Sequence, residues 1–445
     1  MTNTRVVVID VVGLSPDHFQ QTENIPHMAS LLSQGRLFQM KPVFPPVTLP
    51  VQASLTTGKH PEEHGIVANG FYFPENFQVA FWEQAARLVQ TERIWESLKS
   101  KDPSLKTAIL FFQNSLYSNS DVVITPRPLH TEEGLIQWCY SKPVGFYEEI
   151  CRQIGEFNLF HFWGPMASIE SSRWIAKAAV ETMDRVRPNL MFVYLPHLDY
   201  CMQKYGPEDP IVLDELRQVD QEVGRIVQGV EDLGLADEAV YIILSEYMFY
   251  EVRGDIPLNR ILRENGLLEV RTIQGREYLD IELSPAFAMV DHQIAHIYTK
   301  PAYEKAVRRV LEKVDGIDML LDGEGKNSFQ VNHPRSGDFI AVSSKNRWFS
   351  YYWWDDRSRE PDFATHVDIH RKPGYDPLEL FVDFETRKIS QDTSLIKGSH
   401  GYPAMEKKDY VPFLISGKGS MDLEIPEALC MTDVAAIIEK ILVES

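Results

Sequence analysis

Residues 5–12, RVVVIDVV, form an apolar run that contains one carboxylate, Asp10. A continuous run of β-branched residues predicts a strand that is buried on both faces, as in parallel sheets. Three similar runs follow: KTAILFF at 106–112, NLMFVYLP at 189–196 and AVYIILS at 239–245. Helical spacing of apolar residues separates them, at 25–34, 92–100, 167–186 and 210–232, and a last helix begins at residue 433. The pattern predicts an α/β fold with a mostly parallel sheet between helices.

The length and composition allow a large core with a second unit attached. The chain has 445 residues, of which 44% are hydrophobic, enough for one large domain with an insertion or for two domains. From about residue 255 the sequence changes to short strands, many turns and the aromatic cluster RWFSYYWWDD at 347–356. We expect a catalytic core at 1–254 and 395–445, with an inserted α+β cap at 255–394.

The charge and the cysteines restrict the possible partners and surroundings. The net charge of −20 repels polyanions and argues against a nucleic acid polymer as partner, although bound cations would still admit a small phosphorylated substrate. The four cysteines are scattered without a CxxC pair, which favours a reducing compartment. No apolar stretch reaches the ~18 residues of a membrane span, so we expect a cytoplasmic protein without a membrane partner. The oligomeric state stays open.

Polar residues follow several of the predicted strands, where ligands bind in open α/β sheets. Asp10 ends the first strand, and four further candidates follow later strands or lie in the loop KGSHGY: Asp199, Gln203, Glu246 and His400. Taken singly, an Asp here is more often a cap or a turn former, and a lone His is usually a hydrogen-bonded surface residue. Their joint placement at strand ends instead predicts a divalent-metal site with two ions.

A hydroxyl lies between Asp10 and the other candidates, in PPVTLPVQASLTTGKHPEEHGI, residues 45–66. Thr48 stands between prolines, which restrict the loop around it. A threonine is a weak nucleophile at neutral pH, and a neighbouring metal ion is one way to activate it. The alternative is an ordinary turn residue whose hydroxyl caps the following helix.

The order of these motifs resembles the alkaline phosphatase superfamily, in particular its type I phosphodiesterase and nucleotide pyrophosphatase branch. The resemblance implies a metal-dependent hydrolase of phosphodiester or pyrophosphate bonds, with Thr48 as nucleophile and a phosphothreonine intermediate. It also implies two divalent ions, zinc first, and Asn69 as a substrate-binding residue in place of the asparagine that the branch carries where this chain has Val51. The implied metal ligands are Asp10, Thr48, Glu246 and Tyr247 for one ion, and Asp199, Gln203 and His400 for the other.

The chain departs from the branch at three ligand positions. Gln203 and Tyr247 replace imidazoles and Glu246 replaces an aspartate, which shifts the metal preference towards manganese or magnesium. Missing imidazoles could come from either of two clusters, MVDHQIAHIY with Asp291, His292 and His296, or ATHVDIHRKPGYD with His366, Asp368 and His370. Three alternative functions stay open: a phosphomonoesterase, a phosphonate hydrolase, or a non-catalytic relative that binds a phosphorylated ligand.

Overall fold

The computed structural model describes residues 3–443 and centres on one eight-stranded sheet. The strand order is β2-β24-β11-β1-β10-β5-β6-β9. β1 pairs in parallel with β10 and β11, β10 with β5, and β5 with β6, whereas β24 and β9 are antiparallel to their neighbours. The predicted mostly parallel sheet is confirmed, with the strands β1 (Arg5–Val11), β2 (Gly35–Met40), β5 (Thr107–Leu110), β6 (Val122–Pro126), β9 (Cys139–Lys142), β10 (Leu190–Leu195), β11 (Ala239–Leu244) and β24 (Val411–Gly417).

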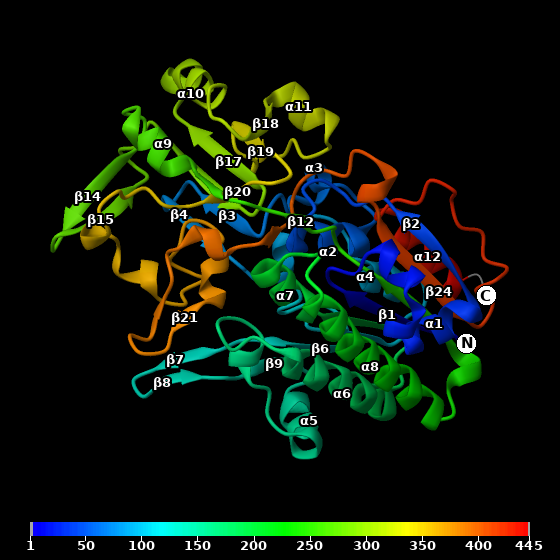
Figure 1. Ribbon diagram of the computed structural model, residues 1–445. Coiled ribbons are helices and arrows are strands. Elements are labelled where there is room, and N and C mark those ends of the chain that lie inside the picture. Colours follow the sequence, from blue (N-terminus) through cyan, green and yellow to red (C-terminus); the bar gives the residue numbers. More distant parts are fainter. Residues whose placement is uncertain (1–2, 444–445) are drawn as a thin grey trace.

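Helices pack around this sheet in two groups, as Figure 1 shows. One group joins α6 (Ile169–Val186) and α8 (Ile211–Asp232), which pack on each other, with α1 (Pro26–Ser33) against α8 and α6 against β10. The other group joins α12 (Asp433–Val443) to β1, to α2 (Thr48–Thr57) and to α4 (Ile94–Lys101). The predicted helices therefore exist within a few residues of their expected bounds. Within residues 3–443, no helix is both long and apolar enough to cross a membrane.

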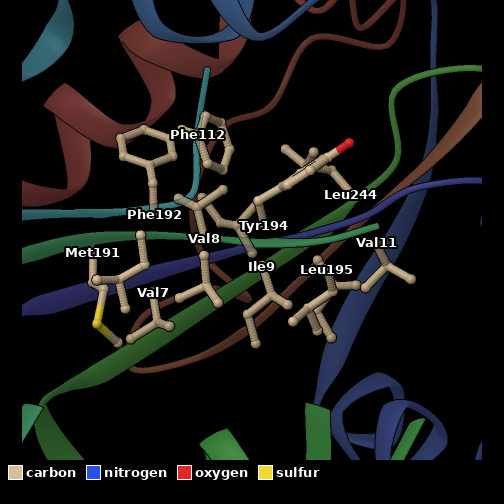
Figure 2. Packing of buried hydrophobic residues seen from close by; sticks show 14 of the residues in the cluster. Val7, Val8, Ile9, Val11, Phe112, Met191, Phe192, Tyr194, Leu195 and Leu244 are labelled. Carbon is tan, nitrogen blue, oxygen red and sulfur yellow. The ribbon is translucent and has the colours of Figure 1, made fainter. Parts of the chain in front are cut away.

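The first strand is buried on both faces because strands flank it and helices cover it. Val7, Val8 and Ile9 are fully buried. Figure 2 shows Phe192 and Tyr194 of β10 on one side of the strands, with Ile9 and Leu195 on the other, as the two-residue repeat of a strand requires.

Residues 255–394 contain a second, smaller set of elements beside the core, drawn from green to orange in Figure 1. A four-stranded sheet runs β16-β17-β19-β18, and short helices accompany it. Its apolar cluster includes Trp348, Trp353 and Trp354, and also Phe44 and Phe81 from the earlier part of the chain. The bounds of the inserted cap stay a prediction, and its main elements are β16 (Ala286–Asp291), β17 (Ile294–Thr299), β18 (Ile317–Leu321), β19 (Phe339–Ser343), α9 (Leu258–Glu264), α10 (Glu304–Leu311) and α11 (Gly323–Ser328).

Truncation of Ile9 tests this account of the core. Ile9 pairs with Val193 and Ile243 across the sheet and is fully buried, so Ile9→Ala leaves a cavity. The expected loss is about 2–5 kcal/mol in the free energy of unfolding, measured by urea denaturation. The matched control is Val144→Ala at a side chain that is 99% exposed, where we expect a change within about 0.5 kcal/mol. Equal losses in the two variants would contradict the placement of β1.

Candidate active site

The carboxyl ends of three adjacent strands bring three acidic side chains together. Asp10 lies in β1, Glu246 is the second residue after β11, and Asp199 lies in α7 (His197–Tyr205), which begins after β10. Because β1 lies between β10 and β11 in parallel register, these three chain positions meet at one edge of the sheet. All three side chains are buried.

Asp10 and Glu246 form a buried pair that an amide bridges. Gln52 Nε2 donates to Glu246 Oε1 at 2.7 Å and to Asp10 Oδ2 at 3.4 Å. Gln52 Oε1 accepts from the Gln113 backbone N–H at 2.6 Å, which holds the amide nitrogen towards the carboxyls. Burial raises the pKa of Asp10 to about 7 and the pKa of Glu246 well above its usual range.

The pair lacks a counter-charge. Among residues 3–443, no lysine or arginine forms an ion pair with Asp10 or Glu246. Asp10 Oδ1 and Glu246 Oε2 are buried with no donor group in place, and the two carboxyls lie close enough to share a proton. Two buried carboxylate oxygens without donors, beside a hydroxyl, are the donor set of a hard divalent cation. This half of the site therefore fits one metal ion.

Thr48 is the first residue of helix α2, and its hydroxyl does not cap the helix. The N-cap residue is Val47, whose own side chain makes no capping hydrogen bond. The Thr48 hydroxyl instead lies 3.1 Å from the Tyr247 hydroxyl, and either oxygen can donate. Since Thr48 is only 3% exposed, a reacting group must enter this pocket of polar side chains to meet it.

Asp199 has a different surrounding, made of neutral donors. Gln203 Nε2 donates to Asp199 Oδ2 at 2.6 Å, and the Tyr247 hydroxyl donates to Asp199 Oδ1 at 3.3 Å. His400 Nε2 lies 3.8 Å from Asp199 Oδ1, while His400 Nδ1 lies 3.1 Å from the Pro46 carbonyl oxygen. Because a carbonyl only accepts, Nδ1 carries the proton and Nε2 presents a lone pair.

Asn69 connects the start of α2 to the cap region. Its Oδ1 accepts from the Leu49 backbone N–H at 2.9 Å, and its Nδ2 donates to Asp291 Oδ1 at 3.1 Å. The Asn69 backbone N–H donates to Asp291 Oδ2 at 2.8 Å. Asn69 thus fixes the first turn of the helix that carries Thr48. Its role as a substrate-binding residue stays a prediction.

Of the two histidine clusters, one reaches the site. The His292 ring stacks on Tyr375 and on His400, with ring centroids 3.8 and 3.7 Å apart. His296 instead bonds the Val67 carbonyl oxygen, and His366 and His370 are exposed. Within residues 3–443, no three His, Cys, Asp or Glu side chains are grouped so as to hold a metal ion. Any cation must therefore rely on other oxygen donors of the chain or on solvent.

Two polar residues of the site were missed from the sequence. Gln52 lies one helical turn after Thr48, so its spacing puts it on the same face of α2, and that signal was available. Tyr375 donates its hydroxyl to Gln203 Oε1 at 2.8 Å across 172 positions of the chain, and no local pattern indicates that contact.

The fold and the site define an α/β protein with a hydroxyl and buried carboxylates at the carboxyl edge of its sheet. The chain belongs to the type I phosphodiesterase / nucleotide pyrophosphatase family, whose model matches residues 6–376. This membership confirms the family expected from the sequence. The family is one of hydrolases of phosphoester bonds, which confirms the hydrolase expectation at the level of the family.

Curated relatives are similar over part of their length. The bis(5'-adenosyl)-triphosphatase ENPP4 of Bos taurus is 24% identical over 297 residues, which cover 64% of this chain and 54% of that protein. The ectonucleotide pyrophosphatase/phosphodiesterase family member 1 of Rattus norvegicus is 26% identical over 224 residues, which cover 47% of this chain and 20% of that protein. The chain thus spans about half the length of the first of these relatives.

Solved structures share the fold over nearly the whole chain. An inactive variant of murine ectonucleotide pyrophosphatase / phosphodiesterase 5 in complex with AMP superposes with a TM-score of 0.62 and 16% identity, covering 99% of this chain and 95% of that one. The phosphonoacetate hydrolase of Sinorhizobium meliloti 1021 with phosphonoformate gives a TM-score of 0.65, again with 16% identity, covering 99% and 96%. These matches confirm the predicted fold class.

The buried carboxyl of Asp291, which bonds Asn69, predicts how the free energy of unfolding depends on pH. Burial raises the pKa of Asp291 from 3.8 to about 7, so the folded protein holds this proton more tightly than the unfolded chain does. The resulting stability is complete below about pH 4 and is lost as pH rises through about 7. In Asp291→Asn, the fall of the unfolding free energy between pH 4 and 7 should be shallower by up to about 1.4 kcal/mol per pH unit.

The measurement is urea denaturation in the presence of a chelator across this pH range. The slope is the readout, because the amide also loses one hydrogen bond to Asn69 and lowers stability at every pH. The exposed Asp237 provides the control Asp237→Asn, which should keep the wild-type slope. An unchanged slope in Asp291→Asn would show that this carboxyl does not titrate in that range.

Proposed function

We propose that the chain is a hydrolase of phosphodiester or pyrophosphate bonds in which Thr48 is the nucleophile. The observation that supports this best is the position of the Thr48 hydroxyl at the start of a buried helix, 3.1 Å from Tyr247 and within reach of Glu246, one of two carboxyls without a counter-charge. A helix N-terminus also favours a negatively charged phosphoryl group. Thr48 thus has a neighbourhood suited to attack on phosphorus.

The proposed reaction is an in-line displacement followed by hydrolysis. The Thr48 oxygen forms a bond to phosphorus as the bond from phosphorus to the leaving oxygen breaks, giving a phosphothreonine. The hydroxyl proton passes through the Tyr247 hydroxyl to Asp199, whose Oδ1 lies 3.3 Å from Tyr247, and then through solvent to the leaving oxygen. Water next transfers its hydroxyl to phosphorus and its proton to Thr48, which restores the site.

A divalent cation belongs to this proposal. Held by Asp10 and Glu246, it would supply positive charge that favours ionisation of Thr48 and offsets the charge of the phosphoryl group. The donors in this half are oxygens, which supports magnesium or manganese over the zinc first expected from the resemblance.

The proposed substrate is a small phosphorylated molecule, as the names of the relatives suggest: ENPP4 is a bis(5'-adenosyl)-triphosphatase and a structural neighbour binds AMP. A cytoplasmic location is also proposed. Within residues 3–443 all four cysteines are free, which suits a reducing compartment.

Substitution of Thr48 tests the nucleophile. On an activated aryl phosphodiester, Thr48→Ser should keep measurable turnover because it retains a hydroxyl, whereas Thr48→Ala should lose on the order of 10³-fold or more. The matched control is Thr57→Ala on the same helix, where the hydroxyl bonds only backbone groups, the Ala53 carbonyl oxygen and the Lys59 N–H, and it should keep wild-type turnover. Wild-type turnover by a well-folded Thr48→Ala protein would overturn the proposal and favour a non-catalytic role.

The proton path gives a second test, at Tyr247. Tyr247→Phe removes the hydroxyl between Thr48 and Asp199, so turnover of a diester with a poor leaving group should fall by on the order of 10²-fold. Tyr241→Phe is the matched control, because the Tyr241 hydroxyl is buried in β11 without a hydrogen-bond partner. Equal turnover in the two variants, with melting temperatures near wild type, would exclude Tyr247 from the proton path.

A further inference from the structure

The amide of Gln203 has a fixed direction. Its nitrogen lies 2.6 Å from Asp199 Oδ2, and a carboxylate oxygen only accepts hydrogen bonds. The atom nearest Asp199 is therefore the NH₂ group and not the carbonyl oxygen. An amide NH₂ has no lone pair to offer a metal ion, so in this orientation Gln203 is a donor to Asp199 and not a metal ligand.

Tyr375 holds the amide in this direction from the other side. Its hydroxyl donates to Gln203 Oε1 at 2.8 Å, which uses the amide oxygen. The Tyr375 ring packs against Trp82, Trp163 and His292 and is 4% exposed. A flip of the Gln203 amide would place its oxygen against a carboxylate oxygen of Asp199 and would lose the hydrogen bond that Tyr375 donates, so Asp199 opposes it most.

Both oxygens of Asp199 consequently have neutral donors, from Gln203 and Tyr247. The imidazole nearest Asp199 is that of His400, whose Nε2 lies 3.8 Å from Asp199 Oδ1. The His292 ring lies against His400, but its Nε2 faces Asp291 Oδ1, 4.0 Å away. One carboxylate and one imidazole are fewer protein ligands than even an open catalytic zinc site has.

The Asp10 side of the site differs in the number of its carboxyls and in the donors that their oxygens have. It has two carboxyls in place of one, and one oxygen of each, Asp10 Oδ1 and Glu246 Oε2, lacks any donor. Gln52 satisfies only the other two oxygens. A cation that displaces the protons of this pair would meet two carboxylates and two free ligand atoms, whereas the Asp199 side offers one carboxylate whose oxygens already have donors.

We propose that this chain binds one divalent cation tightly, between Asp10 and Glu246, and that the Gln203 amide takes the position at Asp199 that a second cation would occupy. The inference rests on the proposed hydrolase function and deepens it, because it replaces the expected two-ion site by one cation and a hydrogen-bonded carboxyl. Asp199 then stays free to accept the Thr48 proton through Tyr247.

Metal counting tests the inference without an activity assay. The full chain is treated with a chelator, titrated with Mn²⁺ by calorimetry, and its retained manganese is counted by elemental analysis after gel filtration. The wild type should bind one Mn²⁺ per chain tightly, and Asp10→Asn should lose it. Asp199→Asn should keep it, because Asp199 is not a ligand of that ion.

Restoring the second site completes the test. Gln203→His replaces the amide by an imidazole next to Asp199 and His400, so bound manganese should rise to two ions per chain, with the paramagnetic spectrum of a coupled pair. Gln228→His, at an exposed glutamine of α8, is the matched control and should stay at one. Tyr375→Phe releases the Gln203 amide oxygen and should allow a second, weaker ion even if Gln203→His does not fold.

The outcomes separate the inference from the hydrolase proposal. Two tight ions in the wild type, or loss of the single ion in Asp199→Asn, overturn the inference and leave the Thr48 mechanism standing. No tight ion in the wild type also overturns it, and turnover of the aryl diester then decides the hydrolase proposal separately. One ion in the wild type and in Gln228→His, with two in Gln203→His, supports the inference.

Discussion

The buried carboxyl pair of Asp10 and Glu246 is the constraint around which the rest of the site is arranged. Burying ionised groups without a partner is costly, and the parallel sheet forces both side chains to one edge by pairing β1 with β11. Gln52 reduces that cost with one amide nitrogen that reaches both carboxyls. The oxygens that it leaves unpaired are those that the proposed cation would meet.

Much of the core could be predicted because its signals are local. Continuous apolar runs predicted β1, β5, β10 and β11, and the polar residues after them marked the correct edge of the sheet. Contacts between side chains of the site were harder to predict from the sequence. The resemblance put Gln203 in one ligand set with Asp199, but the direction of its amide depends on Tyr375, which is far away in the chain. Similarly, His292 and His370 look equivalent in sequence, and packing alone brings His292 to the site.

The cap region contributes to the site as well as covering it. Asp291 ends β16 and holds Asn69, which in turn holds the first turn of α2. Tyr375 orients Gln203 in the same way. The position of Thr48 therefore depends on side chains from residues 255–394, so a change in the packing of this region alters the geometry at the nucleophile without touching it.

The place of β24 in the sheet has a consequence for the order of folding. This strand, at residues 411–417, lies between β2 and β11 and is antiparallel to both. During synthesis from the N-terminus, β2 emerges more than 370 positions before its partner, and it has no other neighbour in the sheet. Contacts so distant along the chain form slowly, and an unpaired strand edge is prone to aggregation meanwhile. Completion of the sheet at β2 must therefore wait until residues 411–417 have left the ribosome.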